Sequence, residues 1–221
     1  MAHPTGGQGG GGAVTSGMPK IWATDFQTTT LNMTKLVPHH DRPLIEYINL
    51  YEARVPVTPE QAPDYLHFNK SGYPEKLKSS LRDIFEVGGG IIVISERFHD
   101  LLQGFDLGPT RLIEVPVFEY DQQRQRPGRF WILHIVAQKT EFVPEASENV
   151  EMYPSGDAWK PDPWMRGDDV IAVRASAAEG PDLWVDPTLS NRIFVSDRLY
   201  RAIKAEKITA RSLKFKPCRV V

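Results

Sequence analysis

Two serines lie where a catalytic nucleophile could be held. Ser95 and Ser196 each follow an apolar run and precede a stretch with helical spacing, which is where some hydrolases place their nucleophile. Neither serine lies in the G-x-S-x-G pattern of those enzymes. A serine in this place can also accept a hydrogen bond from an unpaired N–H group at the start of a helix. We therefore predict that both serines cap helices and carry no catalysis.

The histidines and the cysteine do not have the spacing of a metal site. His39 and His40 are adjacent and, with Asp41, could form only a weak site in a loop, so a turn is the expected structure. His134 lies in an apolar run and is expected to be a core histidine with satisfied hydrogen bonds. Cys218 is the single cysteine, which excludes an intramolecular disulfide and favours a reducing compartment. We expect no metal ligand and no cofactor.

Two further patterns that could carry chemistry have simpler structural explanations. The glycines at 88–90 precede a strand instead of opening a helix, so they offer no helix N-terminus to a phosphate. Asp168 and Asp169 could act as paired carboxylates of a hydrolase, but they stand before an apolar run, where acids commonly mark a turn. The sequence therefore predicts a protein that is not an enzyme.

The elements around the two serines occur twice along the chain. Residues 91–118 consist of an apolar run, the triplet Ser-Glu-Arg, a helical stretch and an alternating run. Residues 193–220 repeat this order with the triplet Ser-Asp-Arg. The acid after each serine suits the positive end of a helix dipole. The pattern predicts two similar strand–helix–strand units, which either a duplicated scaffold or a chance similarity of short motifs would produce.

The remaining segments complete the prediction of an α+β fold with mixed sheets and short helices. Residues 130–137 are apolar and aromatic, which is typical of a central strand buried on both faces. Apolar residues within 77–85 have helical spacing, and the glycines at 88–90 would end that helix. Residues 144–167 are rich in proline, glycine and acids and predict a long irregular loop, followed by a strand over 168–175.

Composition divides the chain into three parts. Residues 1–17 are glycine-rich and predict a disordered tail. Residues 18–87 are rich in proline and form the N-terminal part of the globular region, with a first strand over 21–26. Residues 88–221 hold both repeated units and form either a domain of their own or the rest of one continuous domain over 18–221.

Composition also excludes several classes of protein. The net charge of -2 argues against a protein that holds nucleic acid mainly through its phosphates. The apolar runs are far shorter than the roughly 20 residues that cross a bilayer, and no basic cluster precedes an apolar stretch near the N-terminus. We expect a cytoplasmic protein that binds neither nucleic acid nor membrane.

Charge is separated along the sequence. Residues 141–186 hold eleven acids against three bases, whereas residues 187–221 hold nine bases against two acids. Either the two segments pack together and neutralise each other, or the acidic segment is a docking surface for a basic partner. Its tryptophans are either core anchors or binding hot spots. The partner-binding residues predicted on this basis are Glu148, Glu151, Asp157, Trp159, Asp162, Trp164, Asp168 and Asp169.

The order of these motifs resembles a bacterial family. The strand that ends in Ser-Glu-Arg-Phe, the strand over 130–135 and the segment Ile-Phe-Val-Ser-Asp-Arg-Leu over 193–199 are similar to immunity family eleven of polymorphic toxin systems, formerly a domain of unknown function. The resemblance covers roughly residues 85–221 and implies a protein that neutralises a cognate toxin by covering its active site. Relatives usually have glycine in the turn that here spans 208–211, and often asparagine in place of His134.

Two other classes of function stay open. Tyr47, Tyr51, Tyr65, His67 and Tyr73 could line a pocket in the N-terminal half, as in an enzyme or a small-ligand-binding protein. A structural subunit of a secretion or phage-derived apparatus is the third reading. A deep pocket with converging polar groups would favour the former class, and a flat, symmetric apolar surface the latter.

Overall fold

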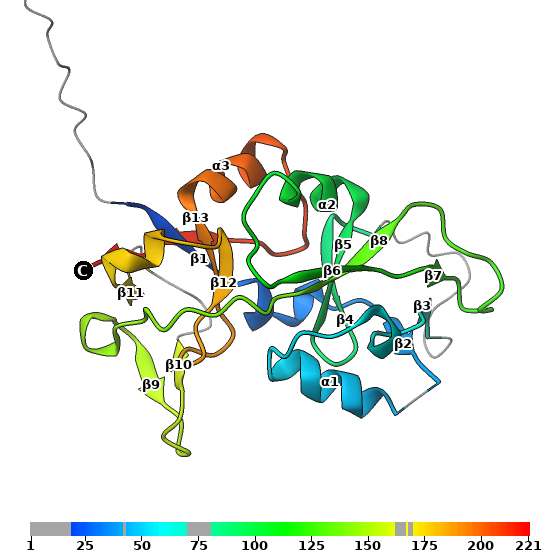
Figure 1. Cartoon of the computed structure of the whole chain (residues 1–221), viewed down its shortest axis with the longest axis horizontal. Coiled ribbons are helices and arrows are strands. Elements are labelled where there is room, and N and C mark those ends of the chain that lie inside the picture. Colours follow the sequence, from blue (N-terminus) through cyan, green and yellow to red (C-terminus); the bar gives the residue numbers. More distant parts are fainter. Residues whose placement is uncertain (1–18, 42, 70–80, 162–166, 168–169) are drawn as a thin grey trace, which may run out of the picture.

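Two four-stranded antiparallel sheets form the centre of the computed structural model, which describes residues 19–41, 43–69, 81–161, 167 and 170–221 (Figure 1). The first sheet has the order β4 (Ile84–Val87), β5 (Ile91–Ser95), β8 (Phe130–His134) and β6 (Arg111–Glu114). The second has the order β12 (Leu183–Val185), β13 (Ile193–Ser196), β1 (Ile21–Thr24) and β14 (Phe215–Pro217). In each sheet the first two strands form a hairpin at the edge. The third strand, β8 or β1, pairs with this hairpin from outside it in the sequence, and the fourth strand, β6 or β14, is the one that follows a helix.

The two similar strand–helix–strand units are confirmed, and the serines cap their helices as predicted. Helix α2 (Glu96–Leu102) begins after Ser95, whose hydroxyl accepts a hydrogen bond from the backbone N–H of Phe98 at 3.4 Å. Helix α3 (Asp197–Ala205) begins after Ser196, which accepts the equivalent bond from Leu199 at 3.2 Å. Both helices lie side by side above the sheets in Figure 1.

The alternating run that leaves each unit is divided between two sheets. In the first unit the run continues from β6 into β7 (Val117–Phe118), and in the second from β14 into β15 (Arg219–Val220). Strand β7 joins β2 (Leu36–His39) and β3 (Tyr65–Phe68) in a three-stranded sheet, whereas β15 pairs with β11 (Ala172–Val173). The strand predicted over 168–175 is therefore confirmed for two residues, and residues 168–169 lie outside the described part of the chain.

The remaining helix, which is the first along the chain, and several short 3-10 turns connect the strands. Helix α1 (Leu44–Glu52) buries Tyr47 and Tyr51 against the first sheet. The 3-10 turns are η1 (Phe26–Thr28), η2 (Thr30–Asn32), η3 (Pro59–Gln61), η4 (Pro144–Ala146) and η5 (Ala175–Ala178). The predicted α+β fold with mixed sheets and short helices is confirmed. The glycine-rich tail predicted over 1–17 lies outside the described residues.

Both faces of each central sheet are covered. Apolar residues from the two sheets and from α2 and α3 form one shared cluster, which includes Ile94, Leu133 and Val195. The other face of the first sheet packs against α1 and the three-stranded sheet, and the other face of the second packs against Phe142 and its neighbours. Every residue of β8 is buried, so the predicted central strand is confirmed at Phe130–His134.

Two predictions of local structure are wrong. Ile84 and Phe85 lie in strand β4 and not in a helix, because they pair with β5 and face opposite sides of the sheet, in two different core clusters. Residues 77–80 of that predicted helix lie outside the described residues. The segment 144–167 is not irregular throughout, because β9 (Val150–Met152) and β10 (Trp159–Pro161) form an antiparallel hairpin within it.

Candidate functional site

The residues that could have carried chemistry have structural roles. The hydroxyl of Ser95 donates to the carboxylate of Asp83 at 2.9 Å, and that of Ser196 to the carboxylate of Asp182 at 2.5 Å. Each hydroxyl is thus held between an aspartate and the N–H of its own helix. Since a carboxylate and a backbone N–H are its partners, each serine orders a helix start rather than attacking a substrate.

The histidines and Cys218 do not form a metal centre in the part of the chain that the structure describes. His39 stacks on Tyr65 with ring centroids 4.4 Å apart, and its Nε2 lies 3.8 Å from the Asp41 carboxylate. Over the described ranges there is no group of three or more His, Cys, Asp or Glu side chains placed to bind a metal ion. Cys218 is buried as a free thiol.

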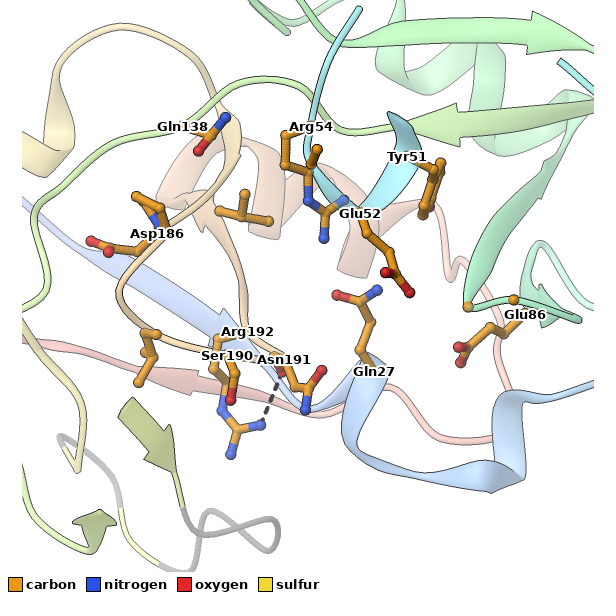
Figure 2. Close-up of a pocket in the computed structure, with 16 residues that line it drawn as sticks. Gln27, Tyr51, Glu52, Arg54, Glu86, Gln138, Asp186, Ser190, Asn191 and Arg192 are labelled. Atoms are coloured by element: carbon orange, nitrogen blue, oxygen red, sulfur yellow. Dashed lines mark hydrogen bonds between the residues drawn. The ribbon is translucent and has the colours of Figure 1, made fainter. Parts of the chain in front are cut away.

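A cleft of about 520 Å³ opens where the edge hairpins of the two sheets meet (Figure 2). Its walls are the C-terminal end of α1 at 51–54, the turn at 88–90 between β4 and β5, and the loop at 186–192 between β12 and β13. Gln27 of η1 and Gln138, which follows β8, complete the lining. The cleft therefore lies between the two equivalent hairpins of the two sheets.

Of the two arginines that line this cleft, Arg192 is buried and Arg54 is half-buried. The backbone of Arg54 has a φ of 56°, and Figure 2 shows its side chain pointing into the open space. One guanidinium nitrogen donates to the carbonyl of Ile135 at 3.4 Å, and the guanidinium carbon lies 5.6 Å from the centre of the Tyr51 ring. Among the described residues no carboxylate forms an ion pair with Arg54. The guanidinium can therefore accept an anionic group from outside the chain.

The wall at 186–192 is fixed by a buried aspartate. One carboxylate oxygen of Asp186 accepts from the backbone N–H groups of Glu141 and Phe142, at 2.7 and 2.8 Å. The other accepts from the N–H and the hydroxyl of Thr188, at 2.9 and 2.6 Å. At the far end of the loop, Asn191 has a φ of 54°. These contacts give the loop a defined shape although it belongs to no helix or strand.

Glu86 faces the same cleft from β4. Burial raises the pKa of its carboxyl to about 7, so a part of the molecules carries a neutral, proton-donating carboxyl at neutral pH. Glu52, in contrast, is exposed at the end of α1. The acids that line the cleft are therefore the buried Asp186, whose two oxygens are occupied by the bonds that fix the loop at 186–192, the solvated carboxylate of Glu52 at the rim, and the carboxyl of Glu86, which titrates near neutrality.

A buried polar cluster lies beneath α1 and next to the cleft. The Tyr51 hydroxyl accepts from the N–H of Ile92 at 3.0 Å and donates to the carbonyl of Leu133 at 3.1 Å. The Tyr47 hydroxyl and both ring nitrogens of His134 are buried without a hydrogen-bond partner among the described residues. His134 is thus a core histidine as predicted, but its hydrogen bonds are not satisfied. Burial, with Arg54 adding to it, lowers the pKa of His134 to about 4.

The predicted partner-binding residues that the structure describes lie on or beside the β9–β10 hairpin. Glu148, Glu151 and Asp157 are exposed, and Glu148 forms an ion pair with Arg219 at 2.7 Å. Trp159 is half-buried and packs edge-on against Phe142, with ring centroids 6.4 Å apart, so it anchors the hairpin. The other predicted residues, Asp162, Trp164, Asp168 and Asp169, lie outside the described residues.

The acidic and basic segments do pack against each other in part. Asp182, of the acidic segment, binds the guanidinium of Arg198, of the basic segment, and Glu148 binds Arg219. Burial raises the pKa of Asp182, but the bonds from Arg198 and Ser196 lower it more, so the net pKa is below its usual range. Asp182 and Asp186 therefore belong to the interior and are not available as surface charge.

The pocket predicted in the N-terminal half is not formed by the residues expected to line it. Tyr51 lines the cleft and Tyr47 packs beside it. Tyr65 and His67 lie in β3 instead, where Tyr65 stacks on His39 and His67 lies edge-on to it. Tyr73 lies outside the described residues. Most of the lining comes from segments that the sequence analysis did not assign to a site. The one signal for them was Asn191, because asparagine tolerates positive φ and therefore suggests a turn at the wall formed by 186–192.

Comparison with known proteins identifies the family. The sequence profile of the Immunity protein family (Imm11) matches residues 27–219, which span both central sheets except β1. No curated protein matches the chain. Among the described helices, each is too short or too polar to cross a bilayer. The chain belongs to the Immunity protein family (Imm11), which is a family of immunity proteins and not of enzymes.

Proposed function

We propose that this protein binds a cognate bacterial toxin in the cytoplasm and neutralises it by covering the toxin's active site. The observation that carries this proposal is the family match, which extends over nearly the whole chain. The structural roles of Ser95 and Ser196 support a mechanism by binding and not by turnover. Cognate pairs of this kind can reach very high affinity, because the cost of association is offset by shape and charge complementarity.

The β9–β10 hairpin is the surface that we propose to meet the toxin first. It extends away from the two central sheets in Figure 1. Glu151 and Asp157 are exposed on it, and Met152 between them has 46% of its surface exposed. Acids around an exposed apolar side chain are typical of a contact that is steered by charge and held by apolar burial. The neighbouring Asp162, Trp164, Asp168 and Asp169 are part of the same proposed surface.

The hairpin is held rigidly enough to present these residues. The backbone N–H of Trp159 donates to the carbonyl of Thr188 at 2.8 Å, and the N–H of Ser190 donates back to the carbonyl of Trp159 at 2.9 Å. The hydroxyls of Tyr153 and Ser190 lie 3.2 Å apart. The hairpin is therefore fixed to the loop at 186–192, and a partner that binds it does not have to order it first.

Co-expression with the product of the neighbouring gene tests the proposal. We expect the pair to restore growth that the toxin alone abolishes, and to co-purify as a complex. Growth rescue without a physical complex would contradict blocking by contact and indicate enzymatic reversal of the damage.

A charge-reversed hairpin tests the proposed surface. The double variant Glu151→Lys and Asp157→Lys is expected to slow association with the toxin about tenfold or more at low salt and to weaken its salt dependence. The double variant Glu46→Lys and Glu60→Lys, which reverses two exposed acids away from the hairpin and changes the net charge equally, is the matched control. Equal effects of the two changes would exclude the hairpin as the steering surface.

A further inference from the structure

Building on the proposed function, we infer that the cleft between the two edge hairpins receives an extended segment of the toxin. In this arrangement the side-chain amides of Gln27, Gln138 and Asn191 bind the main chain of the segment, and Arg54 binds one of its acidic side chains. The cleft would then be a second contact, beside the hairpin, that decides which toxin is recognised.

The first support is the unused hydrogen-bonding capacity in the cleft. The amide groups of Gln27, Gln138 and Asn191 make no side-chain hydrogen bond within the described parts of the chain, and the Arg54 guanidinium, which contacts the Ile135 carbonyl at 3.4 Å and the Tyr51 side chain, pairs with no carboxylate there. A carboxamide offers both a donor and an acceptor, as a peptide bond does. A guanidinium binds carboxylates through two parallel N–H groups. These groups together match a polypeptide that carries an acid.

The second support is the backbone at the two facing walls. Arg54 and Asn191 both have positive φ, 56° and 54°, although neither is a glycine. Arg54 adopts this conformation because it follows the last turn of α1, where the N–H of Val55 donates to the carbonyl of Leu50 at 3.0 Å, and asparagine tolerates it readily; each backbone thereby fixes where its side chain begins. Arg54 ends the helix that packs on the first sheet, and Asn191 lies in the hairpin loop of the second. Both sheets therefore present a polar side chain to one space.

The third support is the difference between two otherwise equivalent hairpins. The first sheet closes its edge hairpin with the three glycines at 88–90, whereas the second uses the longer loop at 186–192. That loop is fixed by Asp186 and forms one wall of the cleft. It is also the segment to which the β9–β10 hairpin is bound. A toxin docked on the hairpin can thus extend a segment directly into the cleft.

The size and charge of the cleft favour a polypeptide with an acidic residue. A volume of about 520 Å³ accommodates a few residues of extended chain. Glu52 is exposed at the rim, where solvent screens its charge, while Arg54 is half-buried. The raised pKa of Glu86, about 7, lets its carboxyl donate a hydrogen bond instead of repelling an acid.

Two variants and one matched control test the inference with the full chain and the toxin. Arg54→Asn removes the guanidinium but keeps a residue type that tolerates positive φ, and Asn191→Gly removes the amide under the same condition. Lys207→Asn is the control, because Lys207 also is a cation with positive φ, 51°, but lies beyond α3. We expect Arg54→Asn to weaken the toxin complex about tenfold to a hundredfold, Asn191→Gly to weaken it less, and Lys207→Asn to leave it unchanged. Urea unfolding confirms that the variants are folded.

The outcomes separate this inference from the proposed function. Tight toxin binding that neither cleft variant weakens overturns the inference and leaves the proposed function standing. If the toxin does not bind the unaltered protein, the proposed function fails, and selection of random displayed peptides on the immobilised protein decides about the cleft. Acid-containing peptides that bind the unaltered protein but not Arg54→Asn would support it as a polypeptide site, and their absence would overturn it.

Discussion

The carboxylate of Asp182 accepts a hydrogen bond from the backbone N–H of Asp106 at 2.9 Å, across the boundary between the two central sheets. Asp83 accepts the equivalent bond from the N–H of Thr209 at 2.8 Å. Each aspartate precedes the edge strand of one sheet, whereas each donor lies in the loop after the helix of the other. The loop after each helix therefore binds the aspartate that holds the capping serine of the other helix. In this way each strand–helix–strand unit helps to order the helix start of the other.

Removal of the Asp182 carboxylate is expected to destabilise the protein strongly. The side chain is nearly fully buried and also accepts from Ser196 and Arg198. Asp182→Ala leaves several donors unpaired, so we expect the free energy of unfolding to fall by about 2 to 4 kcal/mol. Urea unfolding followed by circular dichroism measures this change. The control Asp157→Ala, on the exposed hairpin, should stay within about 0.5 kcal/mol of the unaltered protein, and a similar loss there would contradict the argument.

The two buried tyrosines of α1 should respond in opposite directions to loss of the hydroxyl. Tyr47→Phe removes a buried hydroxyl that has no partner among the described residues, so we expect stability to rise by about 1 kcal/mol. Tyr51→Phe leaves the N–H of Ile92 and the carbonyl of Leu133 without their partner, so we expect a loss of about 1 to 3 kcal/mol. Thermal and urea unfolding of both variants measure the difference. A loss of stability in Tyr47→Phe would show that its hydroxyl has a partner after all.

Glu86 should make the protein less stable as the pH rises towards neutrality. Its pKa is about 7 in the folded chain and 4.5 as the ordinary value, so the folded state binds more protons between these pH values. The free energy of unfolding therefore decreases from about pH 4.5 to about pH 7. Glu86→Gln should remove this decrease and be more stable at pH 8 by about 1 to 2 kcal/mol, since partial exposure screens the effect.

His134 contributes a pH dependence of the opposite sign. Its pKa is about 4 in the folded chain, against the ordinary 6.5, so the unfolded state binds more protons in between and stability rises with pH. Because both proteins retain His134, its contribution cancels in the difference between Glu86→Gln and the unaltered chain. Urea unfolding from pH 4 to 8 gives that difference, and a difference independent of pH would refute the assignment to Glu86.

Lys139 should act as an internal cation that holds the segment after β11. Its ammonium group donates to the carbonyls of Ala177, Glu179 and Pro181, at 2.9, 2.6 and 3.0 Å. It also lies 3.7 Å from the centre of the Trp184 ring. Lys139→Met keeps most of the volume but leaves these acceptors unpaired, so we expect a loss of about 2 to 3 kcal/mol and faster proteolysis at 175–181.

Lys204→Met, on the exposed side of α3, is the matched control for Lys139. Peptide mapping after limited proteolysis shows where the chain is cut. Unchanged cleavage at 175–181 in Lys139→Met would mean that the lysine does not hold this segment.

The local features of the repeated units could be predicted from sequence because they depend on short-range chemistry. A serine followed by an acid after an apolar run is a helix start in either sheet, and this pattern placed Ser95 and Ser196 correctly. The buried strand over 130–134 was equally clear, because all its residues are apolar or aromatic except His134. These predictions needed no knowledge of which strands pair.

Features that depend on pairing between distant segments could not be predicted in this way. Ile84 and Phe85 fit a helical spacing as well as an alternating one, and only their pairing with β5 selects the strand. The β9–β10 hairpin has strands too short for a periodicity to show, and it is held by the contact of Trp159 with Phe142. The cleft was missed for the same reason, since its walls come from segments far apart in the sequence.

The pairing of β1 has a consequence for how the protein is made in the cell. Strand β1 is one of the two inner strands of the second sheet, but its neighbours β13 and β14 end at Ser196 and Pro217. The ribosome must therefore release nearly 200 further residues after β1 before this sheet can close. Under the proposed function, only a finished chain, in which the second sheet has closed, can therefore neutralise the toxin.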